Sequence, residues 1–334
     1  MSAEVLGLGS VAPMASLPLA AFRFVLTPRE TLYVPARNKG NVLRGAFGTA
    51  FRHTACLPEC REPRLCPRGM ACPYRSVFEP VPPPGADTLS KNQDIPRPFI
   101  FRPPPERKTC YKPDEEFEFE LVLVGRGIEF LSFFIIAFRD LAAEGWGLNR
   151  ARCVLQSVGG IGAADSQARI VYDGRDGLVR PLEPGAFQPM LKLREIFLPA
   201  SRRLRLRLLT PTSLKVDGKV IREPEFHHIF KRVRDRVSSL ATFFGSGPLM
   251  ADFRGLGERA ERIATAEAHY EWVELARTSS RTGQRHELSG VIGEATFEGD
   301  FQEFLPWLAL AEWVHVGRHA AWGNGRVSIE QIDA

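Results

Sequence analysis

The order of predicted strands and helices is the feature that most constrains the fold. Hydrophobic periodicity predicts a strand at about 19–27 and then a helix at about 41–55. Alternating acidic and apolar residues later predict a strand at 116–124, followed by an apolar helix at 127–143 and a strand at 151–158. The first half therefore contains a strand and a helix, then an interruption, then a strand, a helix and a strand.

The second half repeats this order. It begins with Arg203–Leu209, which places leucines on one face of a strand and arginines on the other. The later elements are predicted at 225–244 (helix), 269–276 and 288–297 (strands), 301–313 (helix) and 326–332 (strand). Counterparts recur roughly 170 to 185 residues apart, which predicts an α+β fold of two tandem ferredoxin-like (RRM-like) βαββαβ repeats.

The length of 334 residues also favours two domains. We expect the first repeat at 1–160, a linker at 161–199 and the second repeat, with its glycine-rich loop, at 200–334. A proline-rich and cysteine-rich stretch, about 56–113, interrupts the first repeat. Because it is too long for an ordinary loop, we expect something other than backbone pairing to hold it.

Charge points to an anionic partner. The chain has a net charge of +5, and 202–236 alone carries eleven basic and four acidic residues. Arg203, Arg205 and Arg207 are candidate nucleic-acid contacts on one sheet face, although a solvated face would have the same pattern. Without a convincing export signal or an apolar run long enough to cross a bilayer, we expect a cytoplasmic protein.

Four cysteines lie close together in the insert, at Cys56, Cys60, Cys66 and Cys72. Cytoplasmic thiols stay reduced, so these residues fit a metal site better than disulfides. Four thiolates complete a tetrahedral shell around Zn²⁺, and we expect a structural zinc ion here. An iron–sulfur cluster and unligated thiols are the alternatives.

The C-terminal loop combines glycines with cations, which is typical of a phosphate-binding loop, although many such stretches are simple turns. The candidate residues are His315, Gly317, Arg318, His319, Gly323, Gly325 and Arg326. Basic positions elsewhere, Lys215, Lys231 and Arg281, are further candidates for RNA binding, and Phe297 and Trp322 are candidates for base stacking.

A proton carrier is predicted on the first helix. His53 lies at the boundary of its apolar stripe, where an imidazole can exchange protons near neutral pH, although a structural role as a helix cap is the alternative. His315 and His319 are alternative carriers. Near His53 in the sequence are a hydrogen-bond donor and cations suited to phosphate, namely Tyr33, Lys39, Arg44 and Arg52.

Taken together, these motifs resemble those of the CRISPR-associated precursor-crRNA-processing endoribonucleases of the RAMP superfamily. The matching stretches are Asn41–Gly48, the four-cysteine segment ending at Tyr74, Thr210–Lys215, Gly290–Glu294, and Val314–Gly317 with Gly323–Gly325. The resemblance spans most of the chain.

This resemblance implies metal-independent cleavage of CRISPR repeat RNA, with no catalytic cofactor. A 2′-hydroxyl would attack the adjacent phosphate and leave 2′,3′-cyclic phosphate and 5′-hydroxyl ends. The family's histidine, tyrosine and lysine map onto His53, Tyr33 and Lys39. Relatives often carry a histidine at the place of Thr49, so either the role has moved by one turn or catalysis is lost. The alternative function is a non-catalytic RNA-binding subunit of a CRISPR effector complex.

Overall fold

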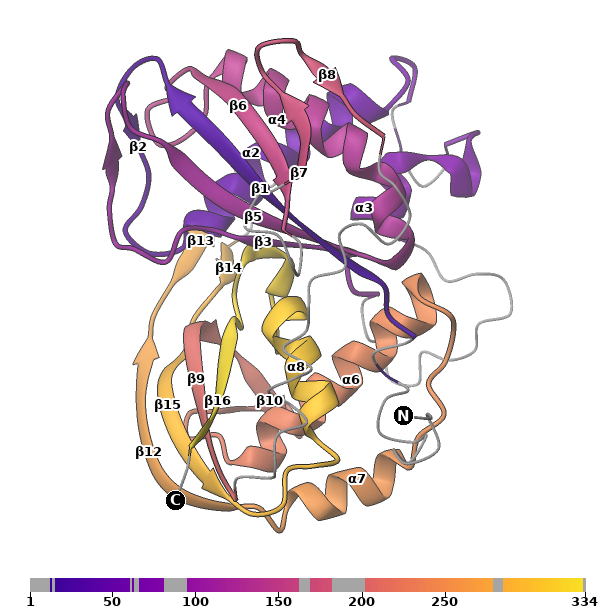
Figure 1. The fold of residues 1–334 in the computed structure, drawn as a ribbon, viewed down its shortest axis with the longest axis vertical. Helices are drawn as coiled ribbons and strands as arrows, with labels where there is room; N and C mark the ends of the chain where they lie inside the picture. Colours follow the sequence, from indigo (N-terminus) through magenta and orange to yellow (C-terminus); the bar gives the residue numbers. More distant parts are fainter. Residues whose placement is uncertain are drawn as a thin grey trace. The chain divides into compact units, whose positions relative to one another are not determined.

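The computed structural model describes residues 13, 16–60, 62, 66–80, 95–161, 169–181, 202–278 and 285–332 (Figure 1). These residues form two compact units. The N-terminal unit contains the described residues between 18 and 181 together with 243–245, and the C-terminal unit contains those from 202 to 242 and from 246 to 332 with 13, 16 and 17. The two predicted tandem repeats are confirmed.

The N-terminal unit is built on a six-stranded antiparallel sheet in the order β3-β5-β1-β6-β7-β8. Its strands are β1 (Leu19–Pro28), β3 (Phe99–Arg102), β5 (Phe117–Val124), β6 (Cys153–Gly160), β7 (Arg169–Asp173) and β8 (Leu178–Val179). The helices α2 (Lys39–Ala55) and α4 (Leu131–Glu144) follow β1 and β5 in the chain. The first four strands and these helices form the predicted βαββαβ repeat.

Phenylalanines form the core of this unit. Burial alternates over Phe22–Pro28 of β1 and Phe117–Leu121 of β5, so one face of each strand places its aromatic rings under the helices. Phe47 of α2 stacks on Phe134 and Phe138 of α4, with ring centroids 4.9 and 4.7 Å apart. Phe24 and Phe119 stack on neighbouring strands, 5.0 Å apart. This packing fixes the rotation of α2 about its axis, and therefore decides which of its residues face solvent.

Two boundaries predicted for this half are wrong. The insert expected to be irregular contains β3, the second strand of the repeat, as well as the helix α3 (Pro73–Phe78) and the 3₁₀ turn η2 (Gly69–Ala71). The predicted linker 161–199 contains β7 and β8, which extend the sheet beyond β6. Two short strands, β2 (Leu32–Tyr33) and β4 (Cys110–Tyr111), pair beside the sheet, and η3 (Gly125–Phe130) leads into α4.

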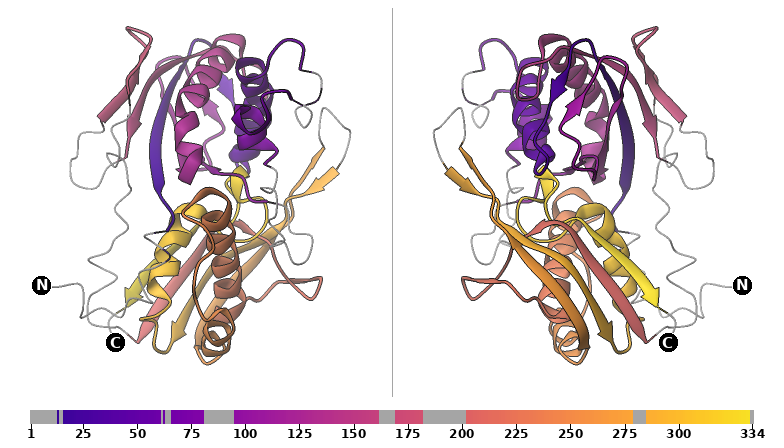
Figure 2. Two further views of the ribbon diagram at one scale, coloured as in Figure 1. Left: turned by 90° about the vertical axis from the view of Figure 1, so that its right-hand side faces the viewer. Right: turned by 90° about the vertical axis from the view of Figure 1, so that its left-hand side faces the viewer.

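The C-terminal unit has the four-stranded order β12-β15-β9-β16, which is the order of the first repeat. Its strands are β9 (Arg203–Thr212), β12 (Ala264–Val273), β15 (Gly290–Glu298) and β16 (Val327–Ile332). The long helices are α6 (Phe226–Phe244) and α8 (Leu305–Val314). Figure 2 shows that the helices of this unit cover one face of its sheet.

The alternation of leucine and arginine along β9 determines which face of the sheet the helices cover. Leu204, Leu206 and Leu208 are buried, whereas the arginines between them lie on the opposite face. Phe226 of α6 packs edge-on against Phe297 of β15, with ring centroids 5.4 Å apart. Phe297 is fully buried, so the prediction that it stacks on RNA bases is wrong.

Smaller elements complete this unit. They are the hairpins β10 (Leu214–Val216) with β11 (Lys219–Ile221) and β13 (Ala276–Thr278) with β14 (Arg285–Glu287), the helix α7 (Phe253–Ala260) and the 3₁₀ turn η4 (Ala320–Trp322). Among the described residues, no helix is both long and apolar enough to cross a membrane.

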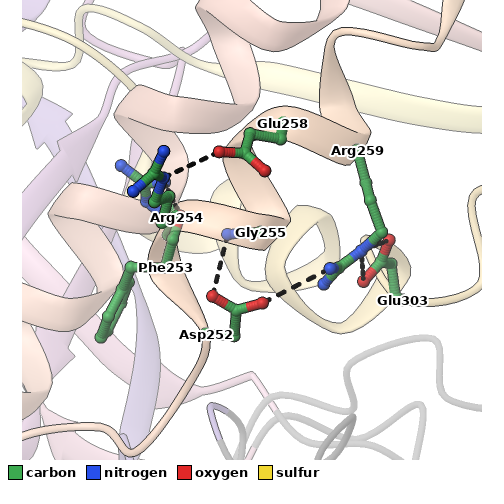
Figure 3. A network of polar contacts seen from close by, with 8 residues as sticks. Asp252, Phe253, Arg254, Gly255, Glu258, Arg259 and Glu303 are labelled. Atoms are coloured by element: carbon green, nitrogen blue, oxygen red, sulfur yellow. Dashed lines mark hydrogen bonds and ion pairs between the residues drawn. The ribbon is translucent and has the colours of Figure 1, made fainter.

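The helix α7, which the sequence analysis did not predict, begins with a polar network (Figure 3). The Asp252 carboxylate accepts a hydrogen bond from the Gly255 amide at 2.9 Å and so caps the helix. Arg259 donates to Glu303 at 2.7 Å and also reaches Asp252 at 3.5 Å. The cation is thus neutralised within the unit.

Candidate functional site

His53 lies on the exposed side of α2. The buried side of this helix carries Leu43, Phe47 and Phe51, which contact the aromatic core, and the exposed positions Thr49 and His53 lie one turn apart. The imidazole is therefore open to a ligand. Arg52 precedes it and donates to the Cys60 carbonyl at 3.5 Å, which ties this end of the helix to the cysteine-rich insert.

Lys39 begins the same helix and is only 3 % exposed. Its ammonium donates to the carbonyl oxygen of Glu106, and the Glu106 carboxylate accepts a hydrogen bond from the Tyr111 hydroxyl. Burial lowers the pKa of Lys39, although the charge of Glu106 opposes the shift. The buried location of Lys39 fits a structural contact better than the predicted catalytic role.

Tyr33 lies on β2, six residues before Lys39 in the chain. It is 48 % exposed, and its strand β2 pairs with β4, where Tyr33 lies opposite Cys110 and Leu32 opposite Tyr111. His53 follows Lys39 by fourteen residues of continuous helix, a separation of about 21 Å at 1.5 Å per residue. The structure therefore does not bring the predicted His53 and Lys39 together.

The arginines predicted to bind RNA on α2 and on β9 already contact side chains of their own units. Arg44 lies over the Phe78 ring, with its guanidinium carbon 5.1 Å from the ring centroid. On the open face of β9, the arginines form ion pairs with glutamates of β15 and β16. These pairs are Arg203–Glu298 at 3.0 Å, Arg205–Glu330 at 3.6 Å, Arg207–Glu294 at 2.9 Å and Arg207–Glu330 at 3.2 Å.

This ladder of ion pairs corrects the expectation of a strongly positive sheet face. The sequence showed the arginines of one strand but not the glutamates that antiparallel pairing brings beside them. Lys231 is likewise paired, since its ammonium lies 2.6 Å from Glu261. The two histidines at the start of α6 serve the helix terminus, where His228 Nδ1 accepts the Glu225 amide at 3.1 Å.

Three separate segments of the C-terminal unit converge at the glycine-rich loop. The Thr210 hydroxyl donates to the Gly323 carbonyl at 2.8 Å and accepts the Arg326 amide at 2.9 Å. The Arg318 amide donates to the Ser213 carbonyl at 3.2 Å. A Cβ atom at Gly290 would lie 2.5 Å from the Thr212 nitrogen. Residues 210–215, 290–294 and 314–326 therefore meet in one place.

Close packing explains two of the loop glycines. A Cβ atom at Gly325 would lie 1.8 Å from the Val316 oxygen, and one at Gly317 would lie 2.6 Å from the Ser213 oxygen. Both have positive φ, 72° and 80° respectively. Gly323 has a φ of 86° and ends η4. The glycines thus have a packing role, and a role in gripping phosphate is not needed to explain them.

The loop histidines are poor candidates for proton transfer. His315 is completely buried, and its Nδ1 lies 3.1 Å from the Asn324 carbonyl oxygen. Burial, assisted by the charge of Arg318, lowers the pKa of His319 to about 4. His319 is therefore neutral at pH 7. Of the three histidines proposed as proton carriers, only His53 is exposed.

The loop and the β13–β14 hairpin form a cluster that sequence reasoning did not predict as a unit. Arg277 lies over the Trp322 ring at 5.2 Å, and the rings of His319 and His286 lie 5.0 and 6.0 Å from it. We call Arg277, His286, His319 and Trp322 the Trp322 cluster. An indole that already stacks with a cation is typical of surfaces that bind bases.

Exposed cations lie near these segments in the sequence. Arg318 is exposed beside the cluster, Lys215 is exposed on the β10–β11 hairpin, and Arg326 is half-buried. Arg281 lies outside the described residues. The C-terminal unit therefore combines an aromatic cluster with solvent-accessible positive charge, which is the combination that single-stranded nucleic acid favours.

Comparisons with known proteins agree with this fold. A family model described as the N-terminal domain of the AF_1859_N type matches residues 17–184, and one described as CRISPR-associated endoribonuclease Cas6 matches 206–327. Among curated proteins, none matches the chain.

Solved Cas6 structures share the arrangement. Thermus thermophilus Cas6 in a product complex is 17 % identical with a TM-score of 0.55, over 94 % of this chain and 99 % of that one. A second Cas6 product complex is 19 % identical with a TM-score of 0.50, over 94 % and 99 %. A Cas6-RT-Cas1–Cas2 complex is 13 % identical with a TM-score of 0.56, over 95 % of this chain and 29 % of that one.

The tandem fold and the match over residues 206–327 make the chain similar to CRISPR-associated Cas6 endoribonucleases. Through residues 17–184, half of its length, the chain belongs to the AF_1859_N family. The match to the Cas6 endoribonuclease model supports an RNA-cleaving enzyme.

Proposed function

We propose that this protein is an endoribonuclease that matures CRISPR guide RNA by cutting repeat RNA without a catalytic metal. The observation that carries the proposal is the convergence of three segments at the glycine-rich loop, inside the region that matches the Cas6 family model. The Trp322 cluster joins this loop to the β13–β14 hairpin, and its indole is a candidate stacking surface.

The reaction would be an in-line attack by a ribose 2′-hydroxyl on the neighbouring phosphate. The 2′-oxygen loses its proton and forms a bond to phosphorus, while the bond to the 5′-oxygen breaks and that oxygen gains a proton. The products carry 2′,3′-cyclic phosphate and 5′-hydroxyl ends. Each step needs a proton carrier and cations at the nonbridging oxygens, and these can be protein side chains.

His53 is the side chain that best fits proton transfer. It is exposed, whereas His315 is buried and the pKa of His319 is about 4. Arg52, which adjoins it, would supply positive charge at the same end of α2. Tyr33 and Lys39 lie toward the other end, so we assign them no direct role in the chemistry.

The test uses labelled repeat RNA from the protein's own locus. We expect cleavage in EDTA at a rate close to that in Mg²⁺, and products whose ends are cyclic phosphate and 5′-hydroxyl. Cleavage that needs Mg²⁺ and leaves 5′-phosphate ends would contradict the mechanism. Chelation should be brief, so that any structural metal is retained.

A second candidate function is a non-catalytic RNA-binding subunit of a CRISPR effector complex. The separation of Lys39 from His53 favours it, because the histidine then lacks one of the partners expected for catalysis. A scaffold would bind repeat RNA at the same affinity yet never cut it. Binding and cleavage measured on the same preparation distinguish the two functions.

A further inference from the structure

The four cysteines of the insert lie together at the end of α2. Cys56 is the residue that ends the helix, and Cys72 immediately precedes α3. Thiol hydrogen bonds link Cys56 to Cys60, Cys60 to Cys66, and Cys66 to Cys72, and Cys72 is close enough to act electrostatically on Cys56. All four are free thiols. Each thiol therefore neighbours two of the others, and the four form a ring.

Backbone amides point at two of these sulfurs. The Cys66 sulfur accepts the amide of Arg68, and the Cys72 sulfur accepts the amides of Tyr74 and Arg75. A turn holds the first contact, because the Gly69 amide donates to the Cys66 carbonyl at 2.9 Å and Gly69 has a φ of 53°. Amide donors to sulfur stabilise a thiolate and orient it, as the hydrogen bonds around metal ligands do.

The four thiols of the ring are buried or half-buried, so solvent reaches them little. Cys72 and Cys66 are 1 % and 7 % exposed, and Cys56 and Cys60 are half-buried. The ring joins the end of α2 to a turn and to α3. Among the described residues of this segment, 56–60, 62 and 66–80, no strand pairs with another part of the chain. A crosslink here would hold the insert against the helix that carries His53.

We propose that Cys56, Cys60, Cys66 and Cys72 bind one Zn²⁺ ion in a closed four-thiolate site. Four sulfurs fill a tetrahedral shell, and no position remains for water or RNA, so the ion is structural and takes no part in cleavage. No three of these sulfurs now lie within 4.8 Å of one another, so binding draws them inward. The site concerns the stability of the insert and goes beyond the proposed function.

Metal analysis of the purified full-length protein tests the site without any RNA. We expect about one zinc ion per chain and little iron. Replacement of zinc by Co²⁺ should give the absorption bands of tetrahedral cobalt thiolate. After chelation of the metal, a thiol reagent should modify four more cysteines per chain than it does in the metal-bound protein. Preparations free of zinc, or containing iron and sulfide instead, would overturn the proposal.

Variants identify the ligands. Cys60→Ser removes a half-buried thiol of the ring, and we expect it to lose most of the bound zinc, because three sulfurs no longer close the tetrahedral shell. Cys72→Ser should behave alike. The matched control is Cys110→Ser, a half-buried thiol on β4, which should keep the zinc. Equal zinc in Cys60→Ser and the control would refute the assignment.

Failure of this test leaves the proposed function untouched, because cleavage is measured separately. If Cys72→Ser does not fold, Cys60→Ser and the zinc content of the unmodified protein still decide the question.

Discussion

Lys39 and His53 lie at opposite ends of one helix, about 21 Å apart. Lys39 is buried under Glu106, and His53 faces solvent. Two side chains expected to act on one phosphate therefore lie in different environments. This separation leads to distinct predictions for each.

Replacing His53 by alanine should slow repeat cleavage by roughly 10²- to 10⁴-fold, because a positioned acid or base is lost. RNA affinity should change little, since the side chain is one exposed group among many contacts. Single-turnover cleavage and equilibrium binding measure the two effects. His269→Ala, an exposed histidine of β12 paired with Glu267, is the control and should cleave normally. Normal cleavage by His53→Ala would place the proton carrier elsewhere.

Replacing Lys39 by methionine should affect stability more than chemistry. The change leaves the Glu106 carbonyl without its buried donor, and we expect a loss of about 1–3 kcal/mol in the free energy of unfolding. Urea denaturation measures this loss, and Lys215→Met, at an exposed lysine, should show almost none. Cleavage per folded molecule should stay near that of the wild type. A fully stable but inactive Lys39→Met would restore a catalytic role.

The Trp322 cluster should contribute to RNA affinity. Trp322→Ala removes the stacking surface and should weaken binding by about 1–3 kcal/mol, the range for loss of one base–aromatic stack. Trp322→Phe keeps an aromatic face and should bind within a few-fold of the wild type. Fluorescence anisotropy with single-stranded repeat RNA measures both. Equal affinities for the alanine and phenylalanine variants would exclude stacking.

Exposed cations should matter more than paired ones. Arg318→Ala should weaken binding and reduce the slope of log affinity against log salt by about one, as expected for loss of one phosphate contact. Arg205→Ala should have a smaller effect, because that guanidinium already lies 3.6 Å from Glu330. Titrations of labelled repeat RNA with each variant at several salt concentrations measure both the affinity and its salt dependence. A larger effect at Arg205 would mean that RNA displaces the glutamate.

Acid should destabilise the C-terminal unit through His319. Its folded-state pKa of about 4 lies below the ordinary value of 6.5, so the unfolded chain binds the proton first as pH falls. Stability should fall between about pH 6.5 and 4, by at most about 3 kcal/mol for this group. Unfolding free energies at pH 7 and 4.5 should differ less in His319→Asn than in the wild type. An unchanged pH dependence would show that His319 titrates normally.

Much of the architecture was predictable because periodicity reports local burial. The alternation of leucine and arginine from Arg203 identified β9, and the recurrence of elements identified the two repeats. The missed strand β3 is only four residues long and is buried at most positions, so it lacks alternation. β7 and β8 were missed within a stretch rich in glycine, which resembles a loop.

The functional surface was less predictable because it depends on contacts between distant residues. The spacing of Cys56, Cys60, Cys66 and Cys72 was sufficient to place four thiols in one segment, and His53 was correctly singled out as a residue near the solvent side of its helix. Spacing could not show that Lys39 would be covered by Glu106, sixty-seven residues away. It also could not show that Arg277 would stack on Trp322.

The sequence by itself therefore determined the tandem α+β repeats, the apolar faces of their elements and the family to which the chain belongs. These properties depend on periodicity and local motifs, which are readable along one chain. Only the tertiary structure decided which cations remain exposed, which of the candidate histidines faces solvent, and where the loop segments converge. Burial and ion pairing set these properties, and both depend on residues that folding brings together from far apart.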